Sequence, residues 1–241
     1  MTYYVTLSQR LNQDLSALIA TTSPGGKLPT EPKLAKQLGV SRTTLREAMR
    51  SFEAQGLISR HQGKGTFVLR PSHVIETGLE ILESIETLAR RIGLQVTLGE
   101  LKVEHGKPSE DEERALEIAP GMLVDHVSRI IVAENRPVAY LVDILPAGIL
   151  SADDLPENFR GSVLDLLLKR GDPPLINSHC EIGAVDASHD IARALNIQRG
   201  DALLRFVSRL YAVDGRIVDY SFSYFLPGYF RFHVVRRIGS V

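Results

Sequence analysis

Hydrophobic residues near the start of the chain recur with the period of a helix. Apolar side chains stand at positions 7, 11, 15, 18 and 19, separated mostly by three or four residues. This spacing places them on one stripe of an amphipathic helix. The sequence Ser23-Pro24-Gly25-Gly26 follows and is of a kind that ends helices. The pattern therefore predicts a first helix that begins near Leu7.

Two more helices are predicted directly afterwards, over residues 31–38 and 42–55. Pro32 lies in the first turn of the first of these, where a helix needs no backbone donor. Gly39 follows at a position that favours a left-handed exit, and Ser41 can accept a hydrogen bond from the free amides of the next helix. A helix, a glycine turn and a serine-capped helix are the parts of a helix-turn-helix.

The exposed face of the helix over residues 42–55 begins with cationic and hydroxyl side chains. In a helix-turn-helix the first turns of the second helix enter the major groove. Arginine can bond guanine in bidentate fashion, and threonine can reach a phosphate or the methyl group of thymine. The candidate DNA contacts are Ser41, Arg42, Thr43, Thr44, Arg46 and Arg50. A solvated basic face with an ordinary helix cap is the alternative interpretation.

A hairpin is predicted directly after this helix. Residues 57–60 and 66–69 have the composition of short strands, and the segment between them is short, glycine-rich and cationic. Such a hairpin is a wing, which can lie along a phosphate strand or enter the minor groove. Its spacing does not fit a nucleotide-binding loop, which needs a following helix. The candidate contacts in the wing are Gln62, Gly63, Lys64 and Gly65.

Part of the chain after residue 73 is repeated. Residues 80–92 have helical spacing, and strand and helix patterns alternate after them. Val127–Ile130 then matches Val207–Leu210, 80 residues later, and the same offset matches Arg136 with Arg216. Each copy has the pattern of a helix, a glycine turn and two strands joined by a polar turn. We therefore expect four strands from two hairpins to share one antiparallel sheet in an α+β domain.

Charge divides the chain at about the same place. Residues 1–70 contain ten Lys or Arg and four Asp or Glu, whereas the remainder contains 18 and 25. A basic first segment is typical of a domain that contacts a polyanion. Chance variation of charge along a soluble chain is the alternative interpretation. The single cysteine, Cys180, excludes an internal disulfide and argues against a cysteine-based zinc site. No apolar run suits a membrane span and no signal peptide is visible, so we expect a cytoplasmic protein.

The N-terminal motifs together resemble the DNA-binding domain of the GntR superfamily of bacterial regulators. The resemblance covers about 45 residues in matching order and spacing, over 26–31, 34–35, 38–48, 56–58 and 63–68. It implies DNA contacts from the start of the second helix, namely Ser41, Arg42, Thr43, Thr44 and Arg46, and from the wing at Gln62 and Gly63. Pro32 stands where the family often has an arginine, so no contact is implied at that position.

The C-terminal part resembles the effector-binding domain of the HutC subfamily, whose fold is similar to chorismate lyase. The resemblance rests on three segments, Glu83–Leu94, Phe159–Leu167 and Asp219–Tyr224. It implies an α+β chain with a winged helix-turn-helix over residues 1–70 and a linker over 71–77. An effector-binding and dimerisation domain, an antiparallel sheet with helices, then follows over residues 78–241.

The same resemblance implies a small effector, usually acidic or phosphorylated, between the two repeat halves. Arg129 matches a family arginine that suits a carboxylate or phosphate. Ser162 starts a predicted helix, where a hydroxyl and free amides favour an anion. Asp219 could accept bonds from ligand hydroxyls, and Tyr224 could stack on the ligand or donate to it. A structural salt bridge at Arg129 and a simple helix cap at Ser162 are the alternatives.

Apolar residues stand where sugar-phosphate binders of the subfamily carry polar ones, at Ile131, Leu141 and Leu164. We therefore expect an effector with one anionic end and an apolar body.

These patterns predict an effector-controlled repressor that binds an inverted-repeat operator as a homodimer. An architectural DNA binder without an effector is one alternative, and a lyase-like enzyme is another. The enzyme has little support, because the histidines at 105, 179 and 189 show no nucleophile–base spacing, metal pattern or cofactor loop. We therefore expect no catalytic residue, no metal and no cofactor.

Overall fold

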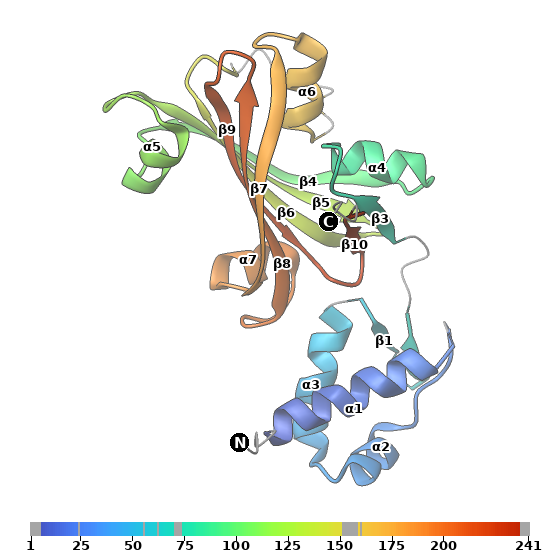
Figure 1. Cartoon of the computed structure of the whole chain (residues 1–241). Helices are drawn as coiled ribbons and strands as arrows, with labels where there is room; N and C mark the ends of the chain where they lie inside the picture. Colours follow the sequence, from blue (N-terminus) through green and yellow to red (C-terminus); the bar gives the residue numbers. More distant parts are fainter. Residues whose placement is uncertain are drawn as a thin grey trace, which may run out of the picture.

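The computed structural model describes residues 6–23, 25–54, 56–61, 63–69, 74–150, 159 and 161–236. The elements form a small N-terminal domain and a larger C-terminal domain, as Figure 1 shows. Within these ranges no helix has the length and apolar character needed to cross a membrane.

The N-terminal domain is a three-helix unit followed by a hairpin. Its helices are α1 (Leu7–Thr21), α2 (Glu31–Leu38) and α3 (Arg42–Ala54). Strands β1 (Ile58–His61) and β2 (Gly65–Val68) pair antiparallel. The predicted helix-turn-helix and wing are therefore confirmed. Side chains from all five elements make its core, including Leu15, Leu34, Leu45, Met49, Ile58 and Val68.

Glycine and serine shape the turn and the wing locally. Gly39 ends α2 with a φ of 66°, and the Ser41 hydroxyl accepts a hydrogen bond from the Thr44 amide at 3.0 Å. Gly65 has a φ of 113°, and a Cβ at this position would lie 2.5 Å from the Lys27 Cε. Glycine has no Cβ and adopts positive φ without strain. Positive φ therefore favours glycine at both positions, and at Gly65 the Lys27 side chain also occupies the space of a Cβ.

The C-terminal domain is built on a six-stranded antiparallel sheet. In spatial order its strands are β4 (Val96–Gly106), β5 (Val124–Ala133), β6 (Arg136–Pro146), β9 (Ile217–Phe225), β8 (Ala202–Ala212) and β7 (Leu175–Asp186). A separate parallel pair joins β3 (Ile75–Gly78) to β10 (Phe230–His233). The four predicted strands lie together in the sheet, and the antiparallel α+β fold is confirmed.

Helices cover both faces of this sheet. Figure 1 shows α4 (Ile85–Arg91) and α6 (Val163–Arg170) on one face, and α5 (Glu110–Leu116) and α7 (His189–Leu195) on the other. The α6 side chains of Val163 and Leu167 pack with Val127 and Leu210 of the sheet. Burying each such side chain stabilises the fold by about 1.5–3 kcal/mol. This packing fixes the start of α6 against the sheet.

Two predicted boundaries differ from the structure. The predicted helix over 80–92 begins only at Ile85, because Ser84 caps it by accepting from the Thr87 amide at 3.0 Å. Ile81 and Leu82 extend the helical spacing in sequence, yet they lie in an irregular segment, exposed by 73% and 51%. The predicted linker over 71–77 is also too long, since β3 begins at Ile75. Residues 71–73 lie outside the described ranges.

The two repeats are not equivalent side chain for side chain. The first hairpin turns through two residues, Glu134 and Asn135, both with positive φ. The second turns through three, because the Ala212 amide donates to the Arg216 carbonyl across residues 213–215. Arg129 therefore lies opposite Leu141, whereas Arg209 lies opposite Tyr220 and not Ser221. A shift of one residue turns every side chain of a strand to the other face.

Arg129 and Arg209, which match in sequence, consequently lie on opposite faces of the sheet. Ser208 takes the position in β8 that Arg129 takes in β5, since it lies opposite Ser221. Arg209 donates from Nε to the Ala115 carbonyl at 3.2 Å on the face that carries α5. The face that carries α6 therefore has an arginine in one half of the domain and a serine at the matching position in the other half.

Deleting Asp214 leaves two residues between Ala212 and Arg216, so the three-residue turn of the second hairpin can form only if β8 moves by one residue relative to β9. We expect β8 either to slip by one residue, which moves Leu210 out of the core at a cost of about 2 kcal/mol, or to break its pairing with β9. Circular dichroism should show a large fall in the thermal midpoint or loss of cooperative unfolding. The same-length substitution Val213→Asn is the control. A deletion variant that melts within about 2 °C of the wild type would contradict this account of the register.

Candidate functional site

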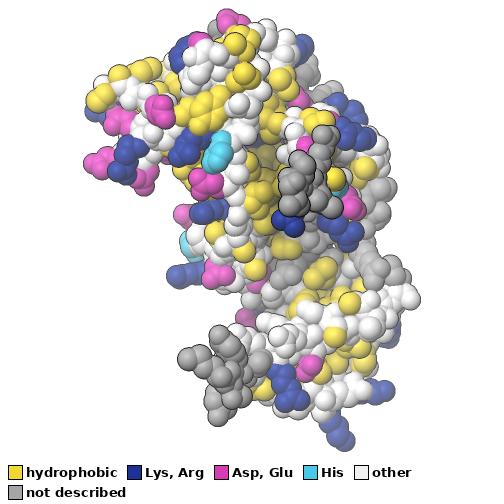
Figure 2. Space-filling model, in the orientation of Figure 1, with side chains coloured by type: hydrophobic (Ala, Val, Ile, Leu, Met, Phe, Trp, Pro, Cys, Tyr) yellow, Lys and Arg dark blue, Asp and Glu magenta, His cyan; other side chains and the backbone are white. Residues whose placement is uncertain are grey.

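A groove lies between α3 and the wing of the N-terminal domain. It has a volume of about 690 Å³, and its lining includes Arg46, Arg50, Gly63, Lys64 and Gly65. Residues predicted from two separate motifs are thus brought to one surface. Figure 2 shows Lys and Arg side chains gathered at the end of this domain that is farther from the larger domain. Such a concentration of cations suits a polyanion.

Acidic neighbours hold two of these arginines. The Arg46 Nε donates to Glu31 at 2.6 Å, and Arg50 pairs with Glu47 at 3.5 Å. Both arginines stay more than half exposed, so the pairs orient the guanidinium groups without burying them. Exposed pairs of this kind contribute only about 0–1 kcal/mol, so a phosphate or a base edge can replace the carboxylate.

The remaining predicted DNA contacts have distinct placements. Arg42, Thr43 and Lys64 are exposed. Ser41 caps α3, and its hydroxyl lies 2.8 Å from the Thr44 hydroxyl. Gln62 lies outside the described residues.

Two further cations line the same groove and were not singled out by the sequence. Lys27 lies with its Nζ 5.9 Å from the centre of the Phe67 ring, and Arg60 pairs with Glu53 at 2.6 Å. Residues 25–28 bond to β2, with the Leu28 amide donating to the Thr66 carbonyl at 2.8 Å. The sequence holds no signal that links Lys27 to the wing, since the contact of its side chain with Gly65 arises from the pairing of residues 25–28 with β2.

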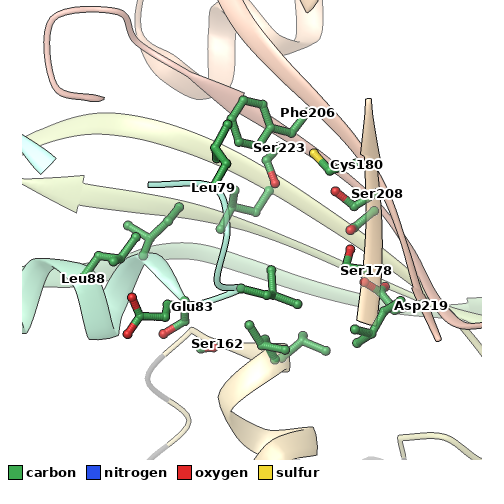
Figure 3. Close-up of a pocket in the computed structure, with 18 of the residues that line it drawn as sticks. Leu79, Glu83, Leu88, Ser162, Ser178, Cys180, Phe206, Ser208, Asp219 and Ser223 are labelled. Atoms are coloured by element: carbon green, nitrogen blue, oxygen red, sulfur yellow. The ribbon is translucent and has the colours of Figure 1, made fainter. Parts of the chain in front are cut away.

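A second cavity lies inside the C-terminal domain, on the sheet face that carries α6. Its volume is about 750 Å³, within the range of small-molecule sites. Figure 3 shows Ser178, Ser208 and Asp219 on the strands, with Ser162 at the start of α6 and Leu79 on the segment opposite. Apolar side chains fill most of the remaining wall, including Leu141, Leu164, Leu167, Phe206 and Phe225. The cavity can therefore hold a largely apolar molecule that carries a polar end.

The Arg129 guanidinium is already paired inside this cavity. It donates to the Asp143 carboxylate, and the two residues are exposed by only 6% and 8%. Asp143 lies on β6 opposite Val127, two residues along β5 from Arg129, so the pair crosses two strands diagonally. This is the structural salt bridge that the sequence left open as an alternative. Asp143 itself was missed, although a charge between Leu141 and Leu145 on one face of an apolar strand was a signal.

Two more carboxyl groups are buried beside this pair. Burial, followed by the nearby Asp143 carboxylate, raises the pKa of Asp219 well above its usual range. Burial also raises the pKa of Glu86, and the Arg129 guanidinium opposes that rise. One oxygen of each group has no hydrogen-bond partner among the described residues, and the same holds for the Arg129 Nε. Glu86 was not predicted, because a glutamate outside the apolar stripe of an amphipathic helix is expected on the solvent-exposed face.

The other two predicted effector contacts, Ser162 and Tyr224, lie in different places. Ser162 lines the cavity and also caps α6, where its hydroxyl accepts from the Asp165 amide at 2.9 Å. Tyr224 lies on the opposite face of β9 and stacks on Tyr140 with ring centres 6.3 Å apart. Alternate residues of a strand point to opposite faces, so Asp219 and Tyr224 cannot share this cavity.

The end of α3 contacts the C-terminal domain directly. The Ser51 hydroxyl donates to Asp201 at 2.8 Å, and an Arg136 Nη donates to the Glu53 carbonyl at 2.9 Å. Gly56, with a φ of 71°, lies against the Tyr229 ring, and a Cβ there would be 2.9 Å from the Tyr229 Cε2. We call these three contacts the joint. The helix that lines the basic groove with Arg46, Arg50 and Glu53 is thus held at its C-terminal end by the C-terminal domain.

The raised pKa of Asp219 predicts a pH dependence of stability. Between the ordinary value of 3.8 and the raised native value, the native state keeps a proton that the unfolded chain has lost. Stability therefore falls as pH rises through this window. Asp219→Asn removes that loss, so its thermal midpoint should rise relative to the wild type as pH increases. The exposed Asp186→Asn is the control. A midpoint difference between D219N and wild type that is constant with pH would contradict this reading.

Comparisons with known proteins agree with this geometry. The family model "Bacterial regulatory proteins, gntR family" matches residues 4–68, and the model "UTRA domain" matches residues 92–231. The chain is 27% identical to the mannosyl-D-glycerate transport/metabolism system repressor MngR of Escherichia coli (strain K12) over 97% of this chain and 95% of MngR. It is 26% identical to the HTH-type transcriptional repressor NagR of Bacillus subtilis (strain 168), over 98% and 95%.

Solved structures show the same fold. PhnF from Mycobacterium smegmatis matches with a TM-score of 0.64 at 19% identity, over 95% of this chain and all of that one. The family names and the names of these relatives are those of transcriptional regulators. The two family models together span both domains in the order that the structure gives them. This chain belongs to the gntR family of bacterial regulatory proteins with a UTRA domain, and it is a ligand-responsive DNA-binding regulator of the HutC type.

Proposed function

We propose that this chain is a homodimeric repressor that acts in the cytoplasm, where it binds an inverted-repeat operator. In this proposal residues 1–70 read DNA, and residues 78–241 bind the effector and carry the dimer contact. The observation that carries the proposal is that one helix links both activities, because α3 lines the basic groove with Arg46, Arg50 and Glu53 and meets the joint at its end. An architectural DNA binder has no use for the cavity of about 750 Å³ in the second domain.

The start of α3 enters the major groove in this proposal. Arg42, Thr43 and Arg46 reach base edges or phosphates there, and Ser41 and Thr44 lie at the capped end of the helix, where free amides suit a phosphate. Arg50 and the wing residues Gln62–Gly65 extend the contact along the backbone. Lys64 supplies a positive charge at the wing, and its contact with a phosphate releases a counterion condensed on the DNA.

The joint carries the effect of the effector to α3. Residues 77–86 and Leu88 line the cavity, and the first two of them are the last residues of β3. β3 pairs with β10, and the Ile75 amide donates to the carbonyl of Tyr229, whose ring lies against Gly56. A ligand that shifts the cavity wall therefore acts on the pair of strands that ends at the joint. Such a ligand changes the spacing of the two recognition helices by favouring one arrangement of the domains over another.

The full-length chain can be used to select DNA duplexes from a randomised library. This selection tests the proposal that the chain binds an inverted-repeat operator. We expect two half-sites related by a two-fold axis, with centres about 34 Å or a multiple of it apart. Arg42→Ala should weaken binding by about 1–3 kcal/mol and relax the preference at one position of each half-site. Lys64→Ala should weaken binding to all sequences alike. It should also lower the slope of log K against log salt concentration by about one for each wing.

The control for these variants is Lys107→Ala, which removes an exposed cation from the C-terminal domain. Recovery of single, unrelated half-sites would exclude the dimeric operator. An R42A variant that binds the selected duplex as well as the wild type would exclude the proposed contact of α3.

A further inference from the structure

Three buried polar atoms on residues that line the cavity lack a partner within the described part of the chain. They are the Glu86 Oε1, the Arg129 Nε and the Asp219 Oδ1. Their residues are exposed by only 8%, 6% and 6%. A buried polar atom left unpaired costs about 1–3 kcal/mol, and native proteins keep few of them. Three such atoms around one cavity therefore indicate that a ligand supplies the missing hydrogen bonds.

The charges around these atoms do not suit an anionic ligand. The guanidinium of Arg129 is already neutralised by Asp143, and Glu86 and Asp219 add two more carboxyl groups to one cationic group. A carboxylate or phosphate could accept hydrogen bonds from Glu86 and Asp219 only where both carboxyl groups keep their protons, and an ionised Glu86 or Asp219 would repel it.

A cationic ligand fits only part of the wall. An ammonium group could donate to the two carboxyl groups, yet it offers no acceptor to the Arg129 Nε. It would also place a second positive charge beside the guanidinium, which opposes binding. The three atoms therefore call for a group that donates and accepts.

Hydroxyl groups meet this requirement. A hydroxyl donates to a carboxylate, accepts from a protonated carboxyl group, and accepts from the Arg129 Nε, so it fits in either protonation state of Glu86 and Asp219. Ser208, Ser221 and Ser223 lie on the same sheet face and add hydroxyl partners along the strands. Leu164, Leu167 and Phe206 bound the rest of the space with apolar surface.

We propose that the effector of this cavity is an uncharged compound that presents two or more neighbouring hydroxyl groups to Glu86, Arg129 and Asp219. Its remaining surface is apolar and packs on the leucine-rich wall. This inference rests on the effector function proposed above, and it replaces the anionic end expected from the sequence with a neutral one. The unmatched repeats explain why such a site is one-sided, since Arg129 has Ser208 as its structural counterpart.

Three probes that share one apolar body separate the chemical classes. They are 3-phenylpropane-1,2-diol, 3-phenylpropanoate and 3-phenylpropan-1-amine, titrated by ligand-observed NMR into the full-length chain. We expect the diol to bind at least about tenfold more tightly than the other two probes. Asp219→Ala should weaken binding of the diol by a similar factor. Tyr224→Phe, on the opposite face of the same strand, should leave that binding unchanged.

Each other outcome overturns the inference in a distinct way. If the carboxylate or the amine bound more tightly than the diol, the proposal of a hydroxylated effector would be excluded. The cavity would still be the effector site. Binding of the diol that Tyr224→Phe weakens and Asp219→Ala does not would move the site to the other face of the sheet. Failure of all three probes to bind would exclude both this inference and the assignment of the cavity, while the operator selection would still test DNA binding.

Discussion

The pairing of β8 with β9 is the constraint on which the second domain depends. One extra residue in the turn before β9 shifts β8 relative to its counterpart β5, and a shift of one residue exchanges the two faces of a strand. Ser208 and Leu210 therefore face α6, and Arg209 faces α5. If the repeats were in register, a second guanidinium would face the cavity. Among the described residues the cavity instead has a single buried cation, Arg129, next to three carboxyl groups.

Such a cluster of buried charges and unpaired polar atoms lowers the stability of the fold. A buried ion pair such as Arg129 with Asp143 seldom stabilises a fold more than apolar residues of the same size would, because both ions lose water. Unpaired atoms on Glu86 and Asp219 add to that cost. Binding of a polar effector in the cavity would explain why the chain keeps these destabilising residues. The cavity is connected to the DNA-binding domain through β3 and β10. The last residues of β3 and the segment that follows them line the cavity, and β3 pairs with β10, which lies next to the joint.

The sequence predicts the N-terminal domain closely because local signals set its boundaries. Gly39, Ser41 and the wing glycines act within a few residues of themselves, and each has the role expected of it. The second domain depends on longer-range pairing. The start of α4 was misjudged because apolar residues that border a cavity, Ile81 and Leu82, have the same spacing as a helical stripe. Tyr224 was grouped with Asp219 because sequence proximity hides which face of a strand each residue occupies.

The central claim is that the C-terminal domain holds the recognition helix through the joint. Arg136 and Arg216 occupy matching places in the two repeats, yet only Arg136 bonds to α3, at the Glu53 carbonyl. Amide hydrogen exchange of the full-length chain can compare Arg136→Met with Arg216→Met. The account predicts exchange about three- to tenfold faster at the end of α3 and in β1 for the first variant, and no change for the second. Equal exchange in the two variants would contradict the claim.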